Sequence, residues 1–369
     1  MKIAVVSLQA YPLFDPSCRQ KFGGAEMQVV LAARGLAGRG HDVTVVTFDH
    51  GQPAEQTVDG VRVVKSVPPV TGREWMRAAA AQFRLFGLLR LLDPDVVLQP
   101  SVTGLLLTAS LFAWARGKRA ASIIMNDNAF TGEGLGWGLD RACFALGLRL
   151  CDAILVINRF QEAAARRLRV RRARQISLVG TPCVIPPDPG PAAREYVLWV
   201  GRCMPVKRPE AFVRLAARLP AEKFVMVAPP QDEALFERVR AAARECPNLT
   251  LVPGVPRPEM DAYFRRARLL VNTSLSEGFP TVFVEAGSWA CPSVSLRVDP
   301  SGFLSGHGLG AVCGDDEDTL FRTVERLLKD PAAAREMGRR ARAYVGEHGD
   351  VRVVAAEYEA ACLRMLPRP

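Results

Sequence analysis

The chain has 369 residues, of which 49% are hydrophobic and 23% charged, and its formal net charge is +10. This length suits two domains, and the composition excludes a disordered chain. The longest apolar segment, 104–115, is shorter than the roughly 20 residues needed to span a bilayer, so we expect a buried helix there. No signal peptide is apparent, because Met1 and Lys2 lead directly into an apolar segment.

The nine cysteines and four histidines are scattered and lack the close spacing of a zinc site. An odd number of unclustered cysteines is typical of reduced thiols, so we expect a cytoplasmic protein without a bound metal. The positive charge indicates an anionic partner. No DNA-binding or RNA-binding motif is present, so we expect no nucleic acid, whereas an anionic membrane or a phosphate-bearing substrate stays open.

In the first half of the chain, apolar β-branched runs alternate with longer helical patterns, which predicts a parallel α/β sheet. The predicted strands are 2–8, 43–48, 61–66, 95–99, 121–125 and 153–157, and the predicted helices are 25–38, 73–92, 104–115, one near Cys143 and one from Arg159. Gly23 and Gly24 precede the first helix, where free N–H groups could face a ligand, although the motif alone favours an ordinary strand–helix turn.

Three polar features of this half could contact a ligand, and two of them have an alternative interpretation. Asn126 and Asp127 follow a predicted strand, where a ligand could reach them. The glycine-rich segment 131–139 fits a mobile binding loop or a plain surface loop, and its spacing is not that of a dinucleotide-binding fingerprint. Six arginines between Arg166 and Arg174 fit a solvated face, or a patch that contacts membrane lipid or an anionic acceptor.

The proline-rich segment 184–193 predicts a linker, so we expect domains at 1–187 and 188–369. The strand–helix alternation then resumes. The predicted strands are 196–200, 224–227, 249–252, 269–272, 293–296 and 310–313, and the predicted helices include 319–328, 331–345 and 351–366. The acidic run 315–318 precedes one of these helices and is predicted to cap it rather than to bind a metal.

The stretch 271–285 carries the clearest chemical signal, because two glutamates follow a buried strand. Glu277 is at the end of a polar turn, and Glu285 lies eight residues later, in the helix that Gly278 and Pro280 introduce. On one helix they would be about 12 Å apart, beyond the roughly 5–9.5 Å of a glycosidase acid/base pair. They suit hydroxyl groups on two parts of a ligand, although a helix cap and a surface residue remain the alternative.

Four motifs in chain order resemble those of the retaining glycosyltransferases of family 4, which have the GT-B fold. They are Phe22-Gly23-Gly24-Ala25-Glu26, Arg39-Gly40-His41-Asp42-Val43, Gly201-Arg202 with Lys207, and Glu277-Gly278-Phe279 with Glu285. The resemblance covers nearly the whole chain. It implies two doubly wound Rossmann-like domains that face each other across a cleft, with the helix 351–366 packed back on the first.

The resemblance implies that a sugar passes from a UDP- or GDP-sugar to an acceptor hydroxyl with retention of configuration, as in a hexosyltransferase, without metal or other cofactor. It assigns Arg202 and Lys207 to the departing diphosphate, Glu285 to the ribose, and Glu277 to the transferred sugar. The other implied donor-binding residues are Gly23, Gly24, Gly201, Val255, Gly278, Phe279 and Pro280.

On the acceptor side the resemblance implies Asn126 and Asp127, with Asn126 where many relatives have histidine. Arg208 occupies a position that is often glycine in relatives. A nucleotide-sugar epimerase or a phosphorylase on the same fold, and a non-catalytic subunit that binds nucleotide-sugar, are the alternatives. The acceptor is not predicted. We expect a cytoplasmic protein, with contact to the inner membrane face through a basic N-terminal domain as an option.

Overall fold

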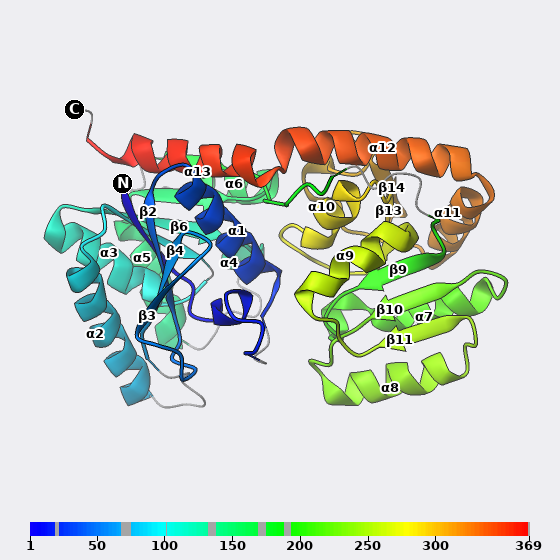
Figure 1. Ribbon diagram of the computed structural model, residues 1–369, viewed down its shortest axis with the longest axis horizontal. Helices are drawn as coiled ribbons and strands as arrows, with labels where there is room; N and C mark the ends of the chain where they lie inside the picture. Colours follow the sequence, from blue (N-terminus) through cyan, green and yellow to red (C-terminus); the bar gives the residue numbers. More distant parts are fainter. Residues whose placement is uncertain are drawn as a thin grey trace. The chain divides into compact units, whose positions relative to one another are not determined.

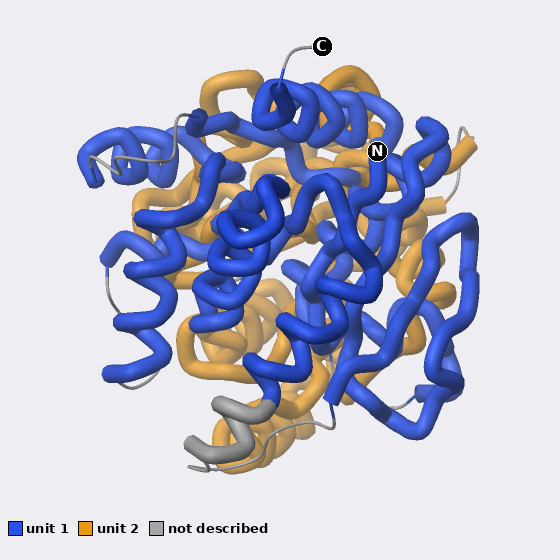
Figure 2. Tube along the Cα trace, turned by 90° about the vertical axis from the view of Figure 1, so that its left-hand side faces the viewer, with its two compact units in different colours: residues 1–182, 351–369 blue, residues 183–350 orange. Residues whose placement is uncertain are grey.

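The computed structural model describes residues 1–18, 22–67, 75–100, 102–131, 138–168, 175–187 and 193–367, with only the backbone of 75–80. The chain forms two compact units: Met1–Pro182 with Val351–Pro369, and Cys183–Asp350 (Figure 2). This division precedes the predicted boundary at 187/188. The reason is local, since the Cys183 N–H donates to the Gly349 carbonyl over 2.7 Å and so ties the start of the proline-rich segment to the second unit.

The first unit contains an eight-stranded sheet in the order β3-β4-β2-β1-β5-β6-β7-β8. Figure 1 labels the strands β2, β3, β4 and β6 of this sheet. The strands are β1 Lys2–Val6, β2 Asp42–Thr47, β3 Glu55–Val58, β4 Val61–Lys65, β5 Val96–Pro100, β6 Arg119–Ile124, β7 Ala153–Val156 and β8 Gln175–Leu178. All neighbours are parallel except β3 and β4. The sequence did not predict β3 and β8 at the two edges, because their partly exposed polar residues form no apolar run.

The helices of the first unit follow the predicted alternation. They are α1 Gly24–Gly38, α2 Trp75–Leu92, α3 Leu105–Arg116, α4 Asn128–Thr131, α5 Gly138–Leu150, α6 Arg159–Arg167 and α13 Val351–Met365. Leu85 and Leu89 of α2 and Phe112 of α3 are buried with Val6 and Val97 of β1 and β5. The strands β1, β5 and β7 are buried along almost their whole length, as expected where a parallel sheet is covered on both faces.

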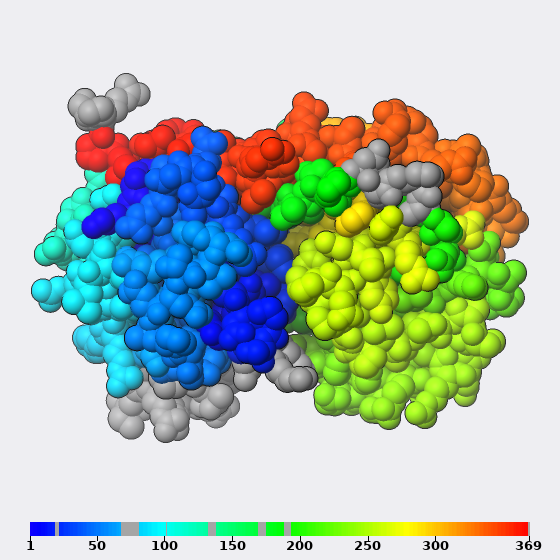
Figure 3. Space-filling view, viewed as in Figure 1, coloured from blue at the N-terminus to red at the C-terminus, as the bar shows by residue number. Residues whose placement is uncertain are grey.

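The C-terminal helix α13 packs against α1 within this unit, and in Figure 3 its red atoms lie beside the blue N-terminal residues. The Arg39-Gly40-His41 motif provides the attachment. Arg39 Nε donates to Glu359 over 2.8 Å, and His41 Nε2 lies 2.7 Å from the other Glu359 oxygen. Gly40 has a left-handed backbone (φ +86°), which favours glycine and turns the chain between the two side chains.

The second unit contains a six-stranded, entirely parallel sheet in the order β11-β10-β9-β12-β13-β14. Its strands are β9 Tyr196–Val200, β10 Phe224–Val227, β11 Leu249–Val252, β12 Ala267–Asn272, β13 Ser293–Ser295 and β14 Gly310–Val312. Its helices are α7 Pro209–Arg218, α8 Glu233–Arg244, α9 Arg257–Arg266, α10 Thr281–Ser288, α11 Glu317–Lys329 and α12 Pro331–His348.

The strand order of the second unit reverses direction between β9 and β12. In doubly wound sheets, ligands bind beyond the carboxyl ends of the strands at this switch point. The loops that start there are 201–207 after β9 and 273–280 after β12, and they contain most of the predicted donor residues. The fold therefore brings two motifs that are far apart in the sequence to the same edge of one sheet.

Three further predictions concern a helix cap, metal binding and membrane-spanning helices. Asp316 caps α11 by accepting from the N–H groups of Asp318 and Thr319 at 3.3 and 2.9 Å, which confirms the predicted cap. Within the described ranges, no cluster of His, Cys, Asp and Glu could hold a metal ion. Among the helices in those ranges, none combines the length and apolar character that a membrane crossing requires.

Candidate functional site

Lys207 and Glu277 form an ion pair at the switch point of the second unit. Lys207 Nζ lies 2.6 Å from Glu277 Oε2, and both side chains are mostly buried. The other carboxylate oxygen, Oε1, accepts from Asn272 Nδ2 at 2.9 Å and from Ser274 Oγ at 2.6 Å. Glu277 is thus held in a fixed orientation from β12 and its loop, while Lys207 occupies the oxygen that faces away from them. The structure brings these two predicted residues together.

Arg208 follows Lys207 and has a left-handed backbone (φ 49°, ψ 52°), which explains a preference for glycine at this position. Its guanidinium pairs with Asp315 and lies 3.5 Å from Glu317. The hydrogen bond from Arg208 lowers the pKa of Asp315, and that from Arg214 lowers the pKa of Glu317. Arg208 therefore fastens the loop to the start of α11 and does not extend the cationic site.

Arg202 is exposed, and among the described residues it makes no ion pair. Arg202 lies in the same loop as Lys207, so a cation that has no ion pair within the described ranges lies near one that is paired with Glu277. Gly201 packs closely on Trp199, because a Cβ built there would lie 3.1 Å from the indole ring. Glycine thus allows the loop to leave β9 directly over this buried ring.

Glu285 of α10 pairs with Arg257, the first residue of α9, at 2.8 Å. Arg257 also lies 3.4 Å from Asp261 on its own helix. Burial raises the pKa of the Glu285 carboxyl above its ordinary value, and the positive charge of Arg257 opposes that effect. Arg257 could not be identified from the sequence, since it belongs to none of the motifs and only the approach of α9 to α10 reveals it.

The remaining predicted residues of the second unit form the apolar support of these charges. The Phe279 ring meets the Phe303 ring edge-on at a centroid distance of 5.1 Å. Pro280 is the N-cap residue of α10, and Gly278 before it is buried. Val255 packs against the same apolar core as Phe279. These contacts fix the position at which α10 begins, and they thereby fix the position of Glu285 within that helix.

In the first unit, the Gly23 N–H donates to Glu26 Oε2 over 2.8 Å, and α1 begins at Gly24. This helix start is therefore capped by its own carboxylate. Asp127 Oδ1 accepts from Asn158 Nδ2 at 2.9 Å and from Gln161 Nε2 at 2.8 Å, so Asp127 is tied to the start of α6. Asn126 is exposed.

Two predicted segments of this unit fall mainly outside the described residues, namely 132–137 of the glycine-rich segment and 169–174 of the arginine run. Of the arginines that are described, Arg166 pairs with Glu162 at 2.7 Å, as in a solvated helix face, and Arg167 is exposed. The wider basic patch stays a prediction.

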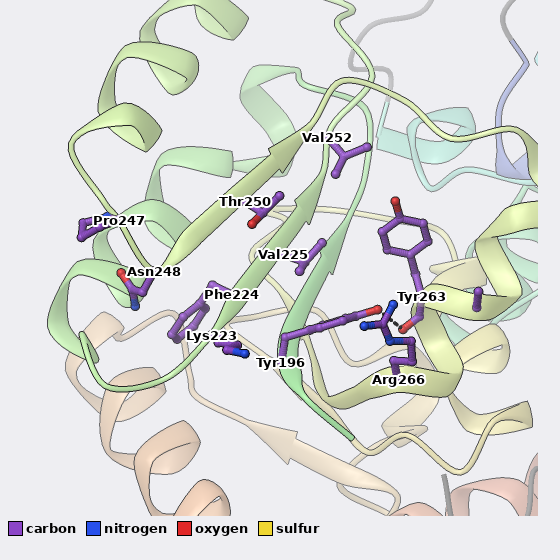
Figure 4. Close-up of a pocket in the computed structure, with 11 residues that line it drawn as sticks. Tyr196, Lys223, Phe224, Val225, Pro247, Asn248, Thr250, Val252, Tyr263 and Arg266 are labelled. Carbon is purple, nitrogen blue, oxygen red and sulfur yellow. Dashed lines mark hydrogen bonds between the residues drawn. The ribbon is translucent and has the colours of Figure 1, made fainter. Parts of the chain in front are cut away.

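A cavity of about 530 Å³ lies elsewhere in the second unit, between α9 and the strands β9, β10 and β11 (Figure 4). Tyr263 of α9 forms one side of it, and Val225 and Thr250 lie on the strands opposite. Arg266 at its lower end is already paired with Glu195 at 2.7 Å. None of the predicted site residues is among those that line this cavity, so it is separate from the Lys207–Glu277 pair.

Comparison with known proteins agrees with both halves of the motif pattern. Residues 22–181 match the family model described as Glycosyltransferase Family 4, and residues 194–330 match the one described as Glycosyl transferases group 1. A D-inositol 3-phosphate glycosyltransferase from Mycolicibacterium paratuberculosis is 30% identical over 162 residues, which cover 42% of this chain but only 37% of that enzyme. The enzyme of the same name from Kineococcus radiotolerans is 26% identical, with 92% of this chain and 90% of the relative covered.

Solved structures show the same architecture. Sucrose-phosphate synthase from Thermosynechococcus elongatus superposes with a TM-score of 0.80 at 18% identity, with 98% of each chain covered. The Anabaena protein HepE, in complex with UDP and glucose, gives 0.73 at 14% identity, with 99% of this chain and 100% of that chain covered. The chain has the GT-B fold and belongs to the family 4 glycosyltransferases, also described as glycosyl transferases group 1.

Proposed function

We propose that the protein is a retaining hexosyltransferase that moves a sugar from a nucleoside-diphosphate sugar, with UDP or GDP, to an acceptor hydroxyl. The observation that carries the proposal is the Lys207–Glu277 pair at the switch point of the second unit. A cation and an oriented carboxylate side by side suit the two parts of such a donor, its diphosphate and its sugar. The UDP and glucose bound by the similar HepE structure support this donor class.

Lys207 and Arg202 would neutralise the diphosphate. The ammonium of Lys207 is a point charge on a flexible stem, so a phosphate oxygen can replace Glu277 as its partner. Arg202 has a planar guanidinium that suits bidentate contact with phosphate oxygens. Negative charge grows on the diphosphate as it departs, and stabilisation of such charge is usually the largest contribution to catalysis.

Glu277 would then bind the transferred sugar. When Lys207 turns to the phosphate, Glu277 Oε2 becomes free to accept from a sugar hydroxyl, while Asn272 and Ser274 keep Oε1 in place. Glu285 would accept from the ribose hydroxyls with Arg257 beside it. The two carboxylates thereby bind different parts of the donor, and neither needs to act as a nucleophile.

The reaction would break the bond between the sugar's anomeric carbon and the phosphate oxygen and form one to the acceptor oxygen on the same face. The acceptor's proton would pass to the departing phosphate oxygen, which is the nearest base that such a geometry offers. The described part of the site contains no histidine that could take that proton instead. No metal or other cofactor enters the proposed step.

For the acceptor we propose only a chemical class. The names of the relatives include inositol 3-phosphate and sucrose phosphate, so phosphorylated cyclitols and sugars are the first acceptors to test. Glycan, glycolipid and metabolite hydroxyls come next. An acceptor with a phosphate would suit the net charge of +10.

Contact with an anionic membrane is part of the proposal for the first unit. The neighbouring helices α2, α3 and α5 expose large apolar side chains, among them Leu91 (85%) and Trp114 (64%). Each of these helices has an arginine in its last turn: Arg90, Arg116 and Arg149. Arg116 lies 3.7 Å from Asp93, and the pair is partly exposed. Apolar side chains with interleaved arginines suit the surface of an anionic bilayer.

Sedimentation with vesicles tests this contact. Vesicles that contain anionic phospholipid should bring down the protein, whereas purely zwitterionic vesicles should not, and Trp114→Ala with Leu91→Ser should abolish the difference. Equal recovery of this double variant and the parent protein would remove α2 and α3 from the contact.

The donor is tested by thermal shift with UDP, GDP, ADP and TDP and their sugar conjugates. A ligand at about a hundredfold excess over its Kd stabilises the native state by about 2.7 kcal/mol. A shift with one nucleotide, followed by sugar transfer to an acceptor, would establish the reaction. Conversion of the nucleotide-sugar without acceptor would indicate an epimerase. Binding without any turnover would indicate the non-catalytic subunit.

A further inference from the structure

Thr273 connects the two loops of the candidate site, although the motifs do not include it. Its side chain is completely buried at the end of β12. Its hydroxyl accepts from the Trp199 indole N–H at 2.9 Å, and its own hydrogen points to the carbonyls of Lys207 and Arg208 at 2.6 and 3.0 Å. One buried hydroxyl thus links β9, β12 and the backbone of the residue that carries the site's cation.

The backbone bond from the Leu275 N–H to the Val206 carbonyl, at 2.8 Å, joins the same two loops. Between these two connections lies the turn at Lys207 and Arg208, and Arg208 is in the left-handed region. A residue other than glycine is strained in this region, so contacts with neighbouring residues are needed to keep the turn in this conformation. Thr273 holds it from inside, and the pairing of Arg208 with Asp315 holds it from outside.

We infer that Thr273, with Trp199 behind it, is a positioning residue that fixes the Lys207 ammonium where the donor diphosphate departs. This inference rests on the proposed function, because it gives Lys207 that role. Without the hydroxyl, the indole N–H and two carbonyls lose a partner in a buried environment, which is costly. The turn would relax and carry Lys207 with it. A misplacement of about 1 Å can cost roughly 100-fold in rate.

The test compares Thr273→Val, which keeps the shape but loses the hydroxyl, with Thr273→Ser, which keeps the hydroxyl. Thr273→Val should lower kcat by roughly 10- to 100-fold. Thr273→Ser should stay within about threefold of the parent protein, since its hydroxyl can still make these bonds. Both should keep the thermal transition cooperative.

Introducing Thr273→Val into the Lys207→Ala variant distinguishes a role of Thr273 in positioning Lys207 from a general structural role. If Thr273 acts through Lys207, Thr273→Val should cause no further loss of kcat in that background. An equal loss with and without Lys207 would overturn the inference. If Lys207→Ala leaves donor binding and turnover unchanged, the proposed function fails at Lys207, and that result does not depend on Thr273.

Arg208 gives a second, independent cycle. Arg208→Gly removes the left-handed strain and the Asp315 tether, whereas Arg208→Ala removes the tether alone. Thr273→Val should therefore cost less kcat beside Arg208→Gly than beside Arg208→Ala. Equal costs would show that Thr273 does not hold the turn. If Thr273→Val fails to fold, Trp199→Phe, which removes the indole donor together with part of the buried ring, takes its place in both cycles.

Discussion

The two units have similar sheets but differ in what their switch points offer a ligand. In the second unit the reversal between β9 and β12 brings Lys207 and Glu277 within 2.6 Å. In the first unit the reversal lies between β1 and β5, and the helix after β1 begins with the Gly23 N–H bonded to Glu26. The residues 19–21 just before it lie outside the described part of the chain.

The shared topology therefore determines where a ligand can bind in each unit, but it does not determine which ligand binds there. Strand order opens the same kind of crevice in both units, and the side chains of the loops decide what each crevice can bind. The described loops of the second unit contribute opposite charges in contact. The described loops of the first unit contribute glycines and the start of α1, where the Gly23 N–H already donates to Glu26. We therefore expect substitutions in the second unit to affect turnover and those in the first to affect stability.

The strongest test of this asymmetry is Lys207→Ala. Removal of a group that stabilises the departing diphosphate should lower kcat by roughly 100- to 1,000-fold, as for other groups that stabilise transition-state charge. The free energy of unfolding should change much less than kcat, because the Glu277 carboxylate keeps its hydrogen bonds from Asn272 and Ser274 when Lys207 is removed. Initial rates with the donor fixed by the thermal-shift panel, together with a melting curve, provide both values.

Lys223→Ala is the matched control, because Lys223 belongs to the same unit but lines the separate cavity in Figure 4. It should leave kcat unchanged. Similar losses in both variants would mean that the effect comes from the net charge of the unit, and the distinction between the two switch points would then lose its main support.

The motifs identified the site residues, but their contacts required the fold. Fixed spacing placed Lys207 and Glu277 at the ends of strands, since apolar runs and a helix-opening proline are visible in the sequence. That β9 and β12 are neighbours depends on a crossover, which no local pattern specifies. Thr273, Trp199 and Arg257 were missed for the same reason. Each acts through a partner that lies far away along the chain.

A medium effect is expected at Glu285, the second carboxylate of this unit. Burial raises its pKa, and Arg257 at 2.8 Å opposes the rise. In Arg257→Met the pKa should rise further, so the charged form that binds ribose is present at high pH and is lost as the pH falls. The donor KM should therefore increase as the pH falls, and this increase should begin at a higher pH in Arg257→Met than in the parent protein.

Arg257→Lys should restore the KM profile of the parent protein, because it returns the positive charge. Asp261→Asn is the opposite control: the Asp261 carboxylate raises the pKa of Glu285, so its neutralisation should not weaken donor binding at low pH. A KM for Arg257→Met that is independent of pH would contradict the role of Arg257. If Glu285→Gln also bound donor normally, the ribose assignment itself would fail.

The smallest effect is expected in the first unit, at Glu26. Glu26→Ala removes the acceptor of the Gly23 N–H and a negative charge at the positive end of α1. Loss of such a cap costs about 1 kcal/mol, which lowers Tm by about 2–4 °C in a unit of this size. Glu26→Gln keeps an acceptor and should retain most of that stability. The donor KM and kcat of both variants should stay close to those of the parent protein. A loss of turnover at unchanged Tm would mean that this carboxylate serves a ligand rather than the helix, and that both switch points take part in the reaction.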